Sequence, residues 1–420
     1  MITFVEAKNF RCLRYIRQPL GDFHVLVGPN ASGKTTFLDV VAFLGRLVSD
    51  GLEEAVGDRT RNFQDLLWGR DGQGFELAIE VKIPESRREH LSDPDFDTVR
   101  YEVKIGANGE HNETAILAEK ALLKKMSSGQ PIIQAEFFPN PAVAPETLMT
   151  GRAAKGTRLL LNKVPGGNDN FYSEVYKESG KGWAPSIRLG SLKSALGNIP
   201  ADETKFPVST WLKNLLTEGV QKIVLNSLLM RQASPPGQVR GFKPDGSNLP
   251  WVIETLKENA PKKFTEWVRH LQTALPDIKD IRTVEREDDR HRYLITKYSG
   301  GLDIPSWMAS DGTLRLLALT LPAYLPDFTG VYLIEEPENG IHPRAVETVY
   351  QSLSSVYGAQ ILVATHSPVI LSMVQAEKVL CFAKAANGAT DIVSGNLHPA
   401  LREWKGETNL GTLYAAGVLG

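Results

Sequence analysis

Runs of apolar residues in the first 190 positions predict β-strands around one helix. Residues 75–81 and 99–105 alternate between polar and apolar positions, which is typical of half-buried antiparallel strands. The short apolar run 24–27 predicts another strand, and a helical pattern begins at residue 36, after a glycine-containing turn. We therefore expect residues 1–190 to form an α/β unit that includes antiparallel strands.

The middle of the chain has the period of helices. Apolar side chains recur at spacings of three and four in two runs: Trp251, Val252, Leu256 and then Phe264, Trp267, Val268, Leu271. Heptads are not sustained over many turns, so no long coiled coil is expected. Strands return after residue 277, and from residue 331 strands and helices alternate. The predicted division is a first part of the fold at 1–190, an inserted mainly helical region at 191–277 and a last part at 278–420.

Composition narrows the class of protein. The 420 residues carry a net charge of −2, and Cys12 and Cys381 are the only cysteines. Two cysteines cannot build a disulfide framework or a cysteine-rich zinc site, and so few are typical of a reducing cytoplasm. The N-terminus lacks a signal-peptide pattern, and no apolar run approaches the roughly 18–20 residues that span a bilayer. We expect a cytoplasmic protein with no membrane contact of its own.

The eight residues from Gly28 to Thr35 have the pattern GxxxxGK[ST] of a phosphate-binding loop. A strand is predicted before them and a helix after them, which is the setting that this loop requires. Glycines allow several backbone N–H groups to face one anion, and the helix N-terminus adds partial positive charge. Lys34 is expected to reach the outer phosphates and Thr35 to bind Mg²⁺ through its hydroxyl. The residues expected to contact a nucleoside triphosphate are Gly28, Pro29, Asn30, Ala31, Ser32, Gly33, Lys34, Thr35 and Thr36.

Two acids end the apolar strand predicted at 331–336. The carboxyl end of a buried parallel strand opens on the ligand crevice of an α/β sheet. One acid there can hold Mg²⁺, and the other can orient and deprotonate an attacking water. Adjacent strand residues point to opposite faces, so the two acids are expected to differ in role. We assign Glu335 to Mg²⁺ and Glu336 to the water.

Two further motifs place polar groups where phosphate could lie. The strand predicted at 360–365 leads directly into His366, which can donate a hydrogen bond to a γ-phosphate. Upstream, Ser310, Asp311 and Gly312 precede a helical run. Ser310 or Asp311 would cap that helix, and its N-terminus could be presented to an anion.

Together these motifs resemble those of ABC-type ATPases. Gly28 to Thr35 matches the Walker A motif, and 333–336 matches Walker B, with Glu335 where transporters usually have aspartate. The segment Ser310 to Gly312 resembles the signature motif, 339–342 lies where the family has its D-loop, and His366 matches the switch histidine. Gln64 is a candidate for the Q-loop glutamine, and so for a metal ligand. The resemblance implies an α/β fold: an ABC-type P-loop NTPase head with a mixed sheet core, an antiparallel β subdomain and an inserted helical region.

The finer resemblance is to the AAA_21-type, OLD-like ATPases of bacteria. It is carried by 6–11, 335–343 and 364–368, and it implies that Arg11 lies near the nucleotide. Members typically work with a nuclease, fused or separate, in defence against phage or mobile DNA. About fifty residues follow His366, too few for the TOPRIM nuclease that the fused kind carries. We therefore expect a separate effector subunit, of TOPRIM or HNH type.

The resemblance also implies a homodimer in which the signature of one subunit covers ATP and Mg²⁺ held by the other. The leading hypothesis is an ATPase subunit of a defence complex, with catalysis by Glu336, His366 and Lys34. One alternative is an assembly scaffold that holds ATP with little turnover, and another is an SMC-like ATPase of DNA maintenance or repair. A transporter subunit is disfavoured because the Leu-Ser-Gly-Gly-Gln signature is missing.

Nucleic acid is a candidate partner. Two groups of basic residues could contact it: Lys120, Lys124, Lys125, Arg152, Lys155 and Arg158, or Lys262, Lys263 and Arg269. The alternative for each group is an ordinary solvated surface.

Overall fold

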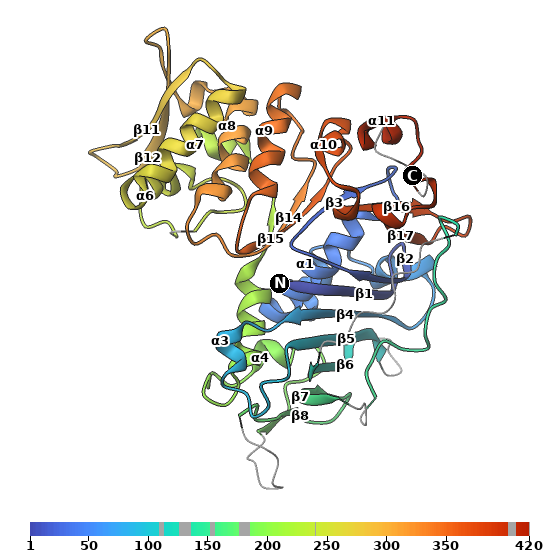
Figure 1. Cartoon of the computed structure of the whole chain (residues 1–420). Coiled ribbons are helices and arrows are strands. Elements are labelled where there is room, and N and C mark those ends of the chain that lie inside the picture. Colours follow the sequence, from blue (N-terminus) through green and yellow to red (C-terminus); the bar gives the residue numbers. More distant parts are fainter. Residues whose placement is uncertain are drawn as a thin grey trace.

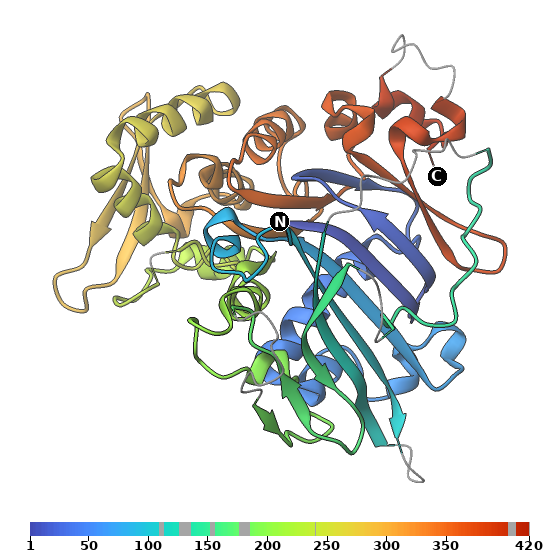
Figure 2. The ribbon, with the colours of Figure 1, turned by 60° about the horizontal axis from the view of Figure 1, so that its bottom comes forward.

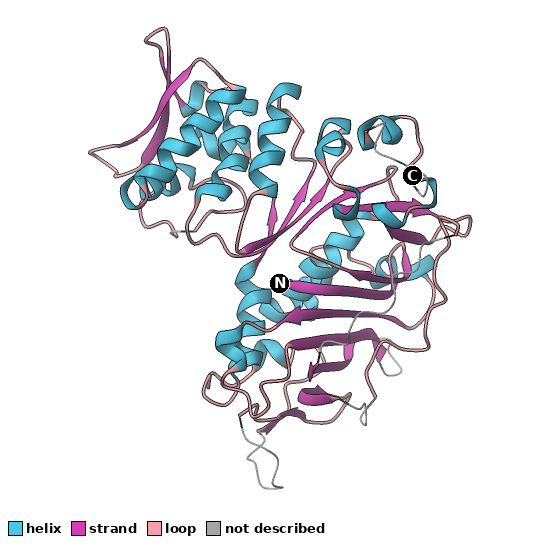
Figure 3. Cartoon of the chain, viewed as in Figure 1, coloured by secondary structure: helices cyan, strands magenta, loops and turns pink. Residues whose placement is uncertain are grey.

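The computed structural model describes residues 1–108, 113–125, 136–151, 156–175, 185–239, 241–401 and 409–419. Within these ranges the chain forms three β-sheets with helices between and outside them (Figure 1, Figure 3). None of the helices in these ranges combines the length and the apolar character that a membrane span requires.

The largest sheet is antiparallel throughout, in the order β2-β1-β4-β5-β6-β7-β8-β9. Its strands are β1 (Ile2–Phe10), β2 (Leu13–Pro19), β4 (Gly74–Lys82), β5 (Thr98–Asn108), β6 (Glu113–Lys124), β7 (Thr157–Lys163), β8 (Asp169–Phe171) and β9 (Ser186–Ile187). Figure 2 shows the strands side by side, from the blue β1 to the green β7. The antiparallel strands predicted at 75–81 and 99–105 are confirmed as β4 and β5, paired from Gly74↔Gly106 to Lys82↔Thr98.

The second sheet has the order β10-β14-β15-β3-β16-β17 and is parallel except for its last pair. Its strands are β3 (Phe23–Val27), β10 (Val220–Ile223), β14 (Gly330–Glu335), β15 (Ala359–Ala364), β16 (Val379–Lys384) and β17 (Thr390–Ser394). Every residue of β3 and β15 is buried, as is typical of parallel strands that are covered on both faces.

Two hydrophobic cores lie on opposite faces of this mixed sheet. Alternate residues of β14 enter different cores: Val331 and Leu333 join one, Tyr332 and Ile334 the other. The first core also contains residues of α1 (Lys34–Asp50) and of the antiparallel sheet, so this helix is packed between the two sheets. The sheets thereby hold the first turn of α1 in a fixed position relative to the ends of β3, β14 and β15.

The second core is covered by five helices of the described chain. These are α6 (Leu249–Asn259), α7 (Pro261–Ala274), α8 (Asp311–Thr320), α9 (Pro343–Ser354) and α10 (Pro368–Met373). The third sheet, β11 (Ile278–Glu285), β12 (Arg292–Tyr298) and β13 (Asp303–Pro305), packs on α6 and α7, and together they form the lobe at the upper left of Figure 1. The other α-helices after α1 are α2 (Leu52–Gly57), α3 (Glu85–Arg88), α4 (Pro207–Asn214), α5 (Ser227–Arg231) and α11 (Leu410–Ala415).

The three-part division of the chain stays a prediction. The range 191–277 contains α4 to α7, and it also contains β10, which pairs in parallel with β14 of the mixed sheet. Packing of β11 and β12 on α6 and α7 links residues after position 277 to the helical region.

Candidate nucleotide-binding site

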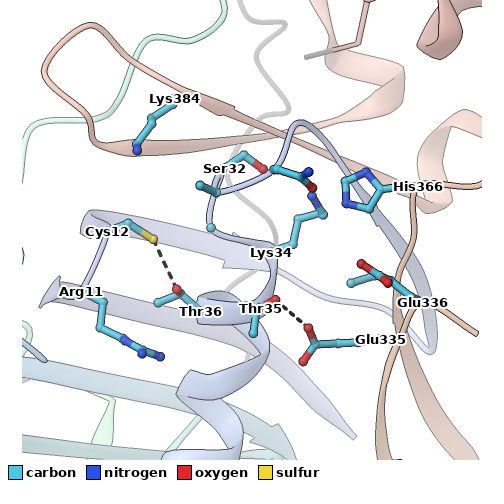
Figure 4. Close-up of a pocket in the computed structure, with 14 residues that line it drawn as sticks. Arg11, Cys12, Ser32, Lys34, Thr35, Thr36, Glu335, Glu336, His366 and Lys384 are labelled. Atoms are coloured by element: carbon cyan, nitrogen blue, oxygen red, sulfur yellow. Dashed lines mark hydrogen bonds between the residues drawn. The ribbon is translucent and has the colours of Figure 1, made fainter. Parts of the chain in front are cut away.

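A cavity of about 440 Å³ opens at the carboxyl ends of β3, β14 and β15. This is the edge of a parallel sheet at which ligands bind in α/β folds. Its lining brings together residues from both ends of the chain: Arg11, Cys12, Asn30, Ala31, Ser32, Gly33, Lys34, Thr35, Thr36, Glu335, Glu336, Ala364, His366 and Lys384. Figure 4 shows these side chains around the loop that joins β3 to α1.

The loop from Gly28 to Gly33 requires glycine at both ends. Gly28 has φ 146°, and a Cβ atom there would lie 2.2 Å from the Phe382 carbonyl oxygen. Gly33 has φ 107°, and its Cβ would lie 2.4 Å from Thr390 Oγ1. The Thr390 hydroxyl donates to the Ser32 carbonyl at 2.9 Å. Strands β16 and β17 therefore lie so close to the loop that a side chain at either position would clash with them.

Two backbone carbonyls of the phosphate loop hold Lys34 in position. Its Nζ donates to the carbonyls of Gly28 at 2.7 Å and Pro29 at 2.9 Å, which leaves one of its three donors for the cavity. Burial lowers the pKa of Lys34, while Glu336 and Glu335 oppose this shift. The buried Ser32 hydroxyl has no hydrogen-bond partner among the described residues. A free ammonium donor and an unpaired hydroxyl on this loop fit a bound phosphate.

Glu335 ends β14 and faces the first turn of α1. The Thr35 hydroxyl donates to Glu335 Oε2 at 2.6 Å, drawn as a dashed line in Figure 4. The other carboxylate oxygen, Oε1, lies 2.6 Å from Nζ of Lys222 on the neighbouring strand β10. A hydroxyl and a carboxylate beside a phosphate loop are the oxygen ligands that Mg²⁺ prefers, so the residues present fit this ion. Lys222 adds a cation that sequence reasoning did not anticipate.

Glu336 lines the same cavity as Glu335, because the chain leaves the strand between them. The φ of Glu336 is 47°, a left-handed conformation that is rare for a residue of its size. Its N–H donates to the Ala364 carbonyl at 2.8 Å, and its side chain accepts a hydrogen bond from Asn339 Nδ2. The alternation expected for adjacent strand residues therefore does not separate the two acids. Strained backbone of this kind is concentrated at functional sites.

His366 follows β15 and is fixed from two sides. Its backbone N–H donates to Glu338 Oε1 at 2.9 Å, and its ring Nδ1 lies 2.9 Å from the Tyr414 hydroxyl. Burial lowers the pKa of His366, and the neighbouring Lys34 lowers it further, against the opposing effect of Glu336 and Glu338. Burial and Lys34 therefore both favour the neutral form of the ring.

The turn between β1 and β2 forms another wall of the cavity. Arg11 has φ 52° and pairs with Asp39 at 3.3 Å. Cys12 Sγ lies 3.4 Å from the hydroxyl of Thr36. Lys384 is the last residue of β16, the neighbour of β3 in the sheet, and it also lines the cavity. Arg11 and Lys384 add positive charge that suits a polyphosphate.

Six of the predicted site residues do not line the cavity. Two of them, Gly28 and Pro29, begin the phosphate loop, and their carbonyls accept from Lys34. Gln64 is exposed on the short helix η1 (Phe63–Leu66), whose last residue accepts a hydrogen bond from the Arg11 N–H. Ser310, Asp311 and Gly312 lie at the start of α8, where Ser310 accepts from the Thr313 N–H at 3.2 Å. Within a single chain, the signature-like segment therefore lies on a different surface from the phosphate loop.

Several residues at the site were missed from the sequence. Tyr414 lies 48 positions after His366 and Lys222 lies in a four-residue strand, and neither has a local motif. Lys384 and Cys12 reach the cavity only because β16 and the β1–β2 turn meet the phosphate loop. Asn339 could have been identified as a site residue, because it begins the segment that matches the D-loop.

The fold and the site together define the nucleotide-binding head of an ABC-type ATPase. The chain belongs to the AAA_21 family, described as "AAA domain, putative AbiEii toxin, Type IV TA system", whose sequence model matches residues 23–372. This membership confirms the family resemblance.

Two known proteins extend the comparison. Over 41 residues the chain is 49% identical to the OLD nuclease of Thermus scotoductus (strain ATCC 700910 / SA-01), a match that covers 10% of this chain and 8% of that protein. The crystal structure of an SMC head bound to the C-terminal winged-helix domain of ScpA is similar, with a TM-score of 0.54 and 14% identity over 96% of this chain and 99% of that one. The expected fold class, an ABC-type head, is thereby confirmed.

Proposed function

We propose that this chain binds ATP with Mg²⁺, hydrolyses it, and uses it as a switch between two associated copies of itself. One observation carries the proposal: the Lys34 ammonium, the Thr35–Glu335 pair, Glu336 and His366 meet in a single cavity at the edge of a parallel sheet. These groups come from three separate parts of the sequence, so their meeting is a property of the fold.

Each side chain has a role that its position supports. Lys34 directs its remaining donor at the outer phosphates, and His366 offers a ring N–H to the γ-phosphate. Thr35 and Glu335 would hold Mg²⁺, which when bound supplies positive charge against the phosphates. Glu336 orients the attacking water and accepts its proton, while Asn339 holds the Glu336 carboxylate in place.

The exposed start of α8 supports a dimer. Ser310 and Asp311 are exposed, and Arg231 anchors Asp311 with a 2.6 Å ion pair. A second copy could place this helix start over the nucleotide, which would then contact both chains. A ligand bound by both copies favours the associated state, and its hydrolysis removes that preference.

The biological setting that we propose is defence against phage or mobile DNA, with a separate effector subunit of nuclease or toxin type. Two comparisons support this setting: the description of the AAA_21 family mentions a toxin, and the matched relative is an OLD nuclease. A cytoplasmic location fits such a role.

Among the two predicted basic groups, the one on α7 is better placed for nucleic acid. Lys262, Lys263 and Arg269 are exposed there. In the other group, Lys124 pairs with Glu80 at 2.7 Å and Lys125 with Asp95 at 2.8 Å, while Arg152 and Lys155 lie outside the described residues. If α7 contacts DNA, the affinity will fall steeply with added salt.

Glu336→Gln tests the switch. The amide keeps the size of the side chain but cannot accept a proton from water, so turnover should fall by at least about a hundredfold while ATP still binds. The variant should accumulate as an ATP-bound dimer, measured by light scattering after gel filtration with ATP and Mg²⁺. Phosphate release measured in parallel reports turnover.

Glu347→Gln is the matched control, because Glu347 is exposed on α9 and lines no part of the cavity. It should hydrolyse ATP and dissociate as the wild type does. Turnover by Glu336→Gln at the wild-type rate would remove Glu336 from its proposed role. A wild-type chain that binds ATP and releases no phosphate would favour the assembly scaffold.

A further inference from the structure

The ring of His366 is oriented by a residue near the end of the described chain. Thr365 and the His366 N–H both donate to Glu338 Oε1, at 2.6 and 2.9 Å, and these bonds fix the backbone. They do not fix the rotation of the ring about its side-chain bonds. The ring contact that the structure describes is the 2.9 Å hydrogen bond between Nδ1 and the Tyr414 hydroxyl.

Tyr414 is itself held firmly. It lies on α11, whose first turn is capped by Asn409 accepting from the Thr412 N–H at 2.9 Å. Leu410 is 2% exposed, and Gly411 lies so close to α10 that a Cβ atom would meet the Pro368 carbonyl oxygen at 2.2 Å. Because the helix is seated by this close approach, the tyrosine hydroxyl has a defined position above the cavity.

The single proton of the tyrosine hydroxyl has two acceptors within reach. One is His366 Nδ1 at 2.9 Å, and the other is the Gly28 carbonyl oxygen at 3.3 Å. The Gly28 carbonyl already accepts from the Lys34 ammonium at 2.7 Å. The ring nitrogen is the nearer of the two, and it has no other hydrogen-bond partner among the described residues.

We infer that Tyr414 is the positioning residue for His366: its hydroxyl donates to Nδ1 and leaves the ring proton on Nε2, where it can donate to the nucleotide. The inference rests on the proposed function, in which His366 contacts the γ-phosphate. A neutral imidazole carries one proton, so the choice of nitrogen decides whether it can donate on the other side. The charged groups that face the ring are Lys34, Glu336 and Glu338.

Tyr414→Phe removes only the hydroxyl. We expect the turnover number for ATP to fall about tenfold, the size of one well-placed hydrogen bond, with nucleotide affinity changed less than about twofold. The matched control is Tyr350→Phe, since this half-buried tyrosine donates to the Met373 carbonyl at 3.3 Å, away from the cavity. The control should keep the wild-type rate.

Two readouts separate positioning from a merely structural role. In a His366→Gln background, Tyr414→Phe should have no further effect on turnover, because the two residues act through one contact. In the single variant, the acid limb of the rate profile should move to higher pH. The tyrosine stabilises the neutral ring, so its removal raises the pKa of His366.

A third measurement does not depend on turnover. Nitrogen-15 spectra of the imidazole rings, with His366 assigned by His366→Gln, should show a protonated Nε2 in the wild type and a mixture of tautomers in Tyr414→Phe. Unchanged tautomer and rate in Tyr414→Phe, or an equal loss in the His366→Gln background, would overturn the inference. A wild-type chain without ATP hydrolysis would instead contradict the proposed function, and the spectra would still decide the role of Tyr414.

Discussion

At the scale of single residues, the carboxylate of Glu335 would interact with two cations, the Lys222 ammonium and the proposed Mg²⁺. Lys222 lies 2.6 Å from its Oε1, and its Oε2 accepts from Thr35, the residue expected to share Mg²⁺ with it. An ammonium and a divalent ion at one carboxylate repel each other, so binding of the ion must displace Lys222 or work against it. We therefore expect Lys222 to raise the concentration of Mg²⁺ that is needed to fill the proposed site.

Lys222→Met tests this competition. We expect the Mg²⁺ concentration for half-maximal ATP binding to fall about threefold, a modest change because Lys222 is 44% exposed and solvent screens its charge. Titration of Mg²⁺ against a fluorescent ATP analogue measures it, with Lys279→Met, an exposed lysine on β11, as the control. An increased Mg²⁺ requirement would mean that Lys222 positions the carboxylate and does not compete for it.

His24 links stability to pH. Burial lowers the pKa of His24 from 6.5 to about 4, and its Nε2 accepts from the Gly21 N–H at 2.8 Å. Protonation would break that bond and charge a buried ring. The stabilisation is therefore complete above pH 6.5 and is lost as the pH falls toward 4. Between pH 7 and pH 5 this group alone should lower the free energy of unfolding by about 2 kcal/mol.

Urea unfolding at pH 7 and pH 5 measures the effect. His24→Gln should lose most of that 2 kcal/mol difference, whereas His90→Gln, at an exposed position, should keep it. An identical pH dependence in His24→Gln and the wild type would show that other groups cause the acid sensitivity.

At the scale of elements, the phosphate loop depends on the strands that press against it. Gly28→Ala adds a Cβ atom 2.2 Å from the Phe382 carbonyl on β16, at a φ of 146°. We expect a loss of about 2–4 kcal/mol in the free energy of unfolding and loss of ATP binding. Calorimetric titration and urea unfolding check both.

Gly57→Ala is the control for this substitution, because a Cβ atom there would meet no atom within 4 Å. It should stay within about 0.5 kcal/mol of the wild type. If Gly28→Ala bound ATP normally, the loop would be more adaptable than its contacts with β16 indicate.

The sequence predicted elements well wherever period and motif agreed. The apolar runs before Lys34 and Glu335 gave β3 and β14, and the alternation at 75–81 gave β4. It could not place β10, whose four residues carry too little pattern, although this strand brings Lys222 to the site. Nor could it predict the contact between Tyr414 and His366, because residues far apart in the sequence produce no periodic pattern. The turn at Glu336 was missed because a positive φ in a glutamate has no sequence signal.

At the scale of the whole molecule, the separation of α8 from the cavity predicts complementation between chains. Lys34→Ala removes the phosphate donor, and Ser310→Asp keeps the helix cap while placing a negative charge beside phosphate. Each variant alone should be inactive. In a mixture, half of the dimers pair one variant with the other, and each such dimer has one intact site of two.

The expected activity of an equal mixture is therefore about a quarter of the wild-type rate, if the two sites work independently in a symmetric dimer. Phosphate release after mixing and re-equilibration measures it. Addition of the wild-type chain to each variant checks that subunits exchange. A mixture that stays inactive while exchange occurs would contradict the shared site.

Asn339 and Gly340 connect Glu336 in the cavity with the start of α8. In the proposed dimer these two regions would contact different nucleotides. Asn339 holds the Glu336 carboxylate, and the carbonyl oxygen of Gly340 would lie 2.7 Å from a Cβ atom on Gly312, at the start of α8. In a symmetric pair, a movement of Glu336 during cleavage would therefore shift the helix tip that touches the opposite nucleotide. The two sites would then be coupled during turnover, and the mixture of Lys34→Ala and Ser310→Asp would depart from the quarter of the wild-type rate that independent sites give.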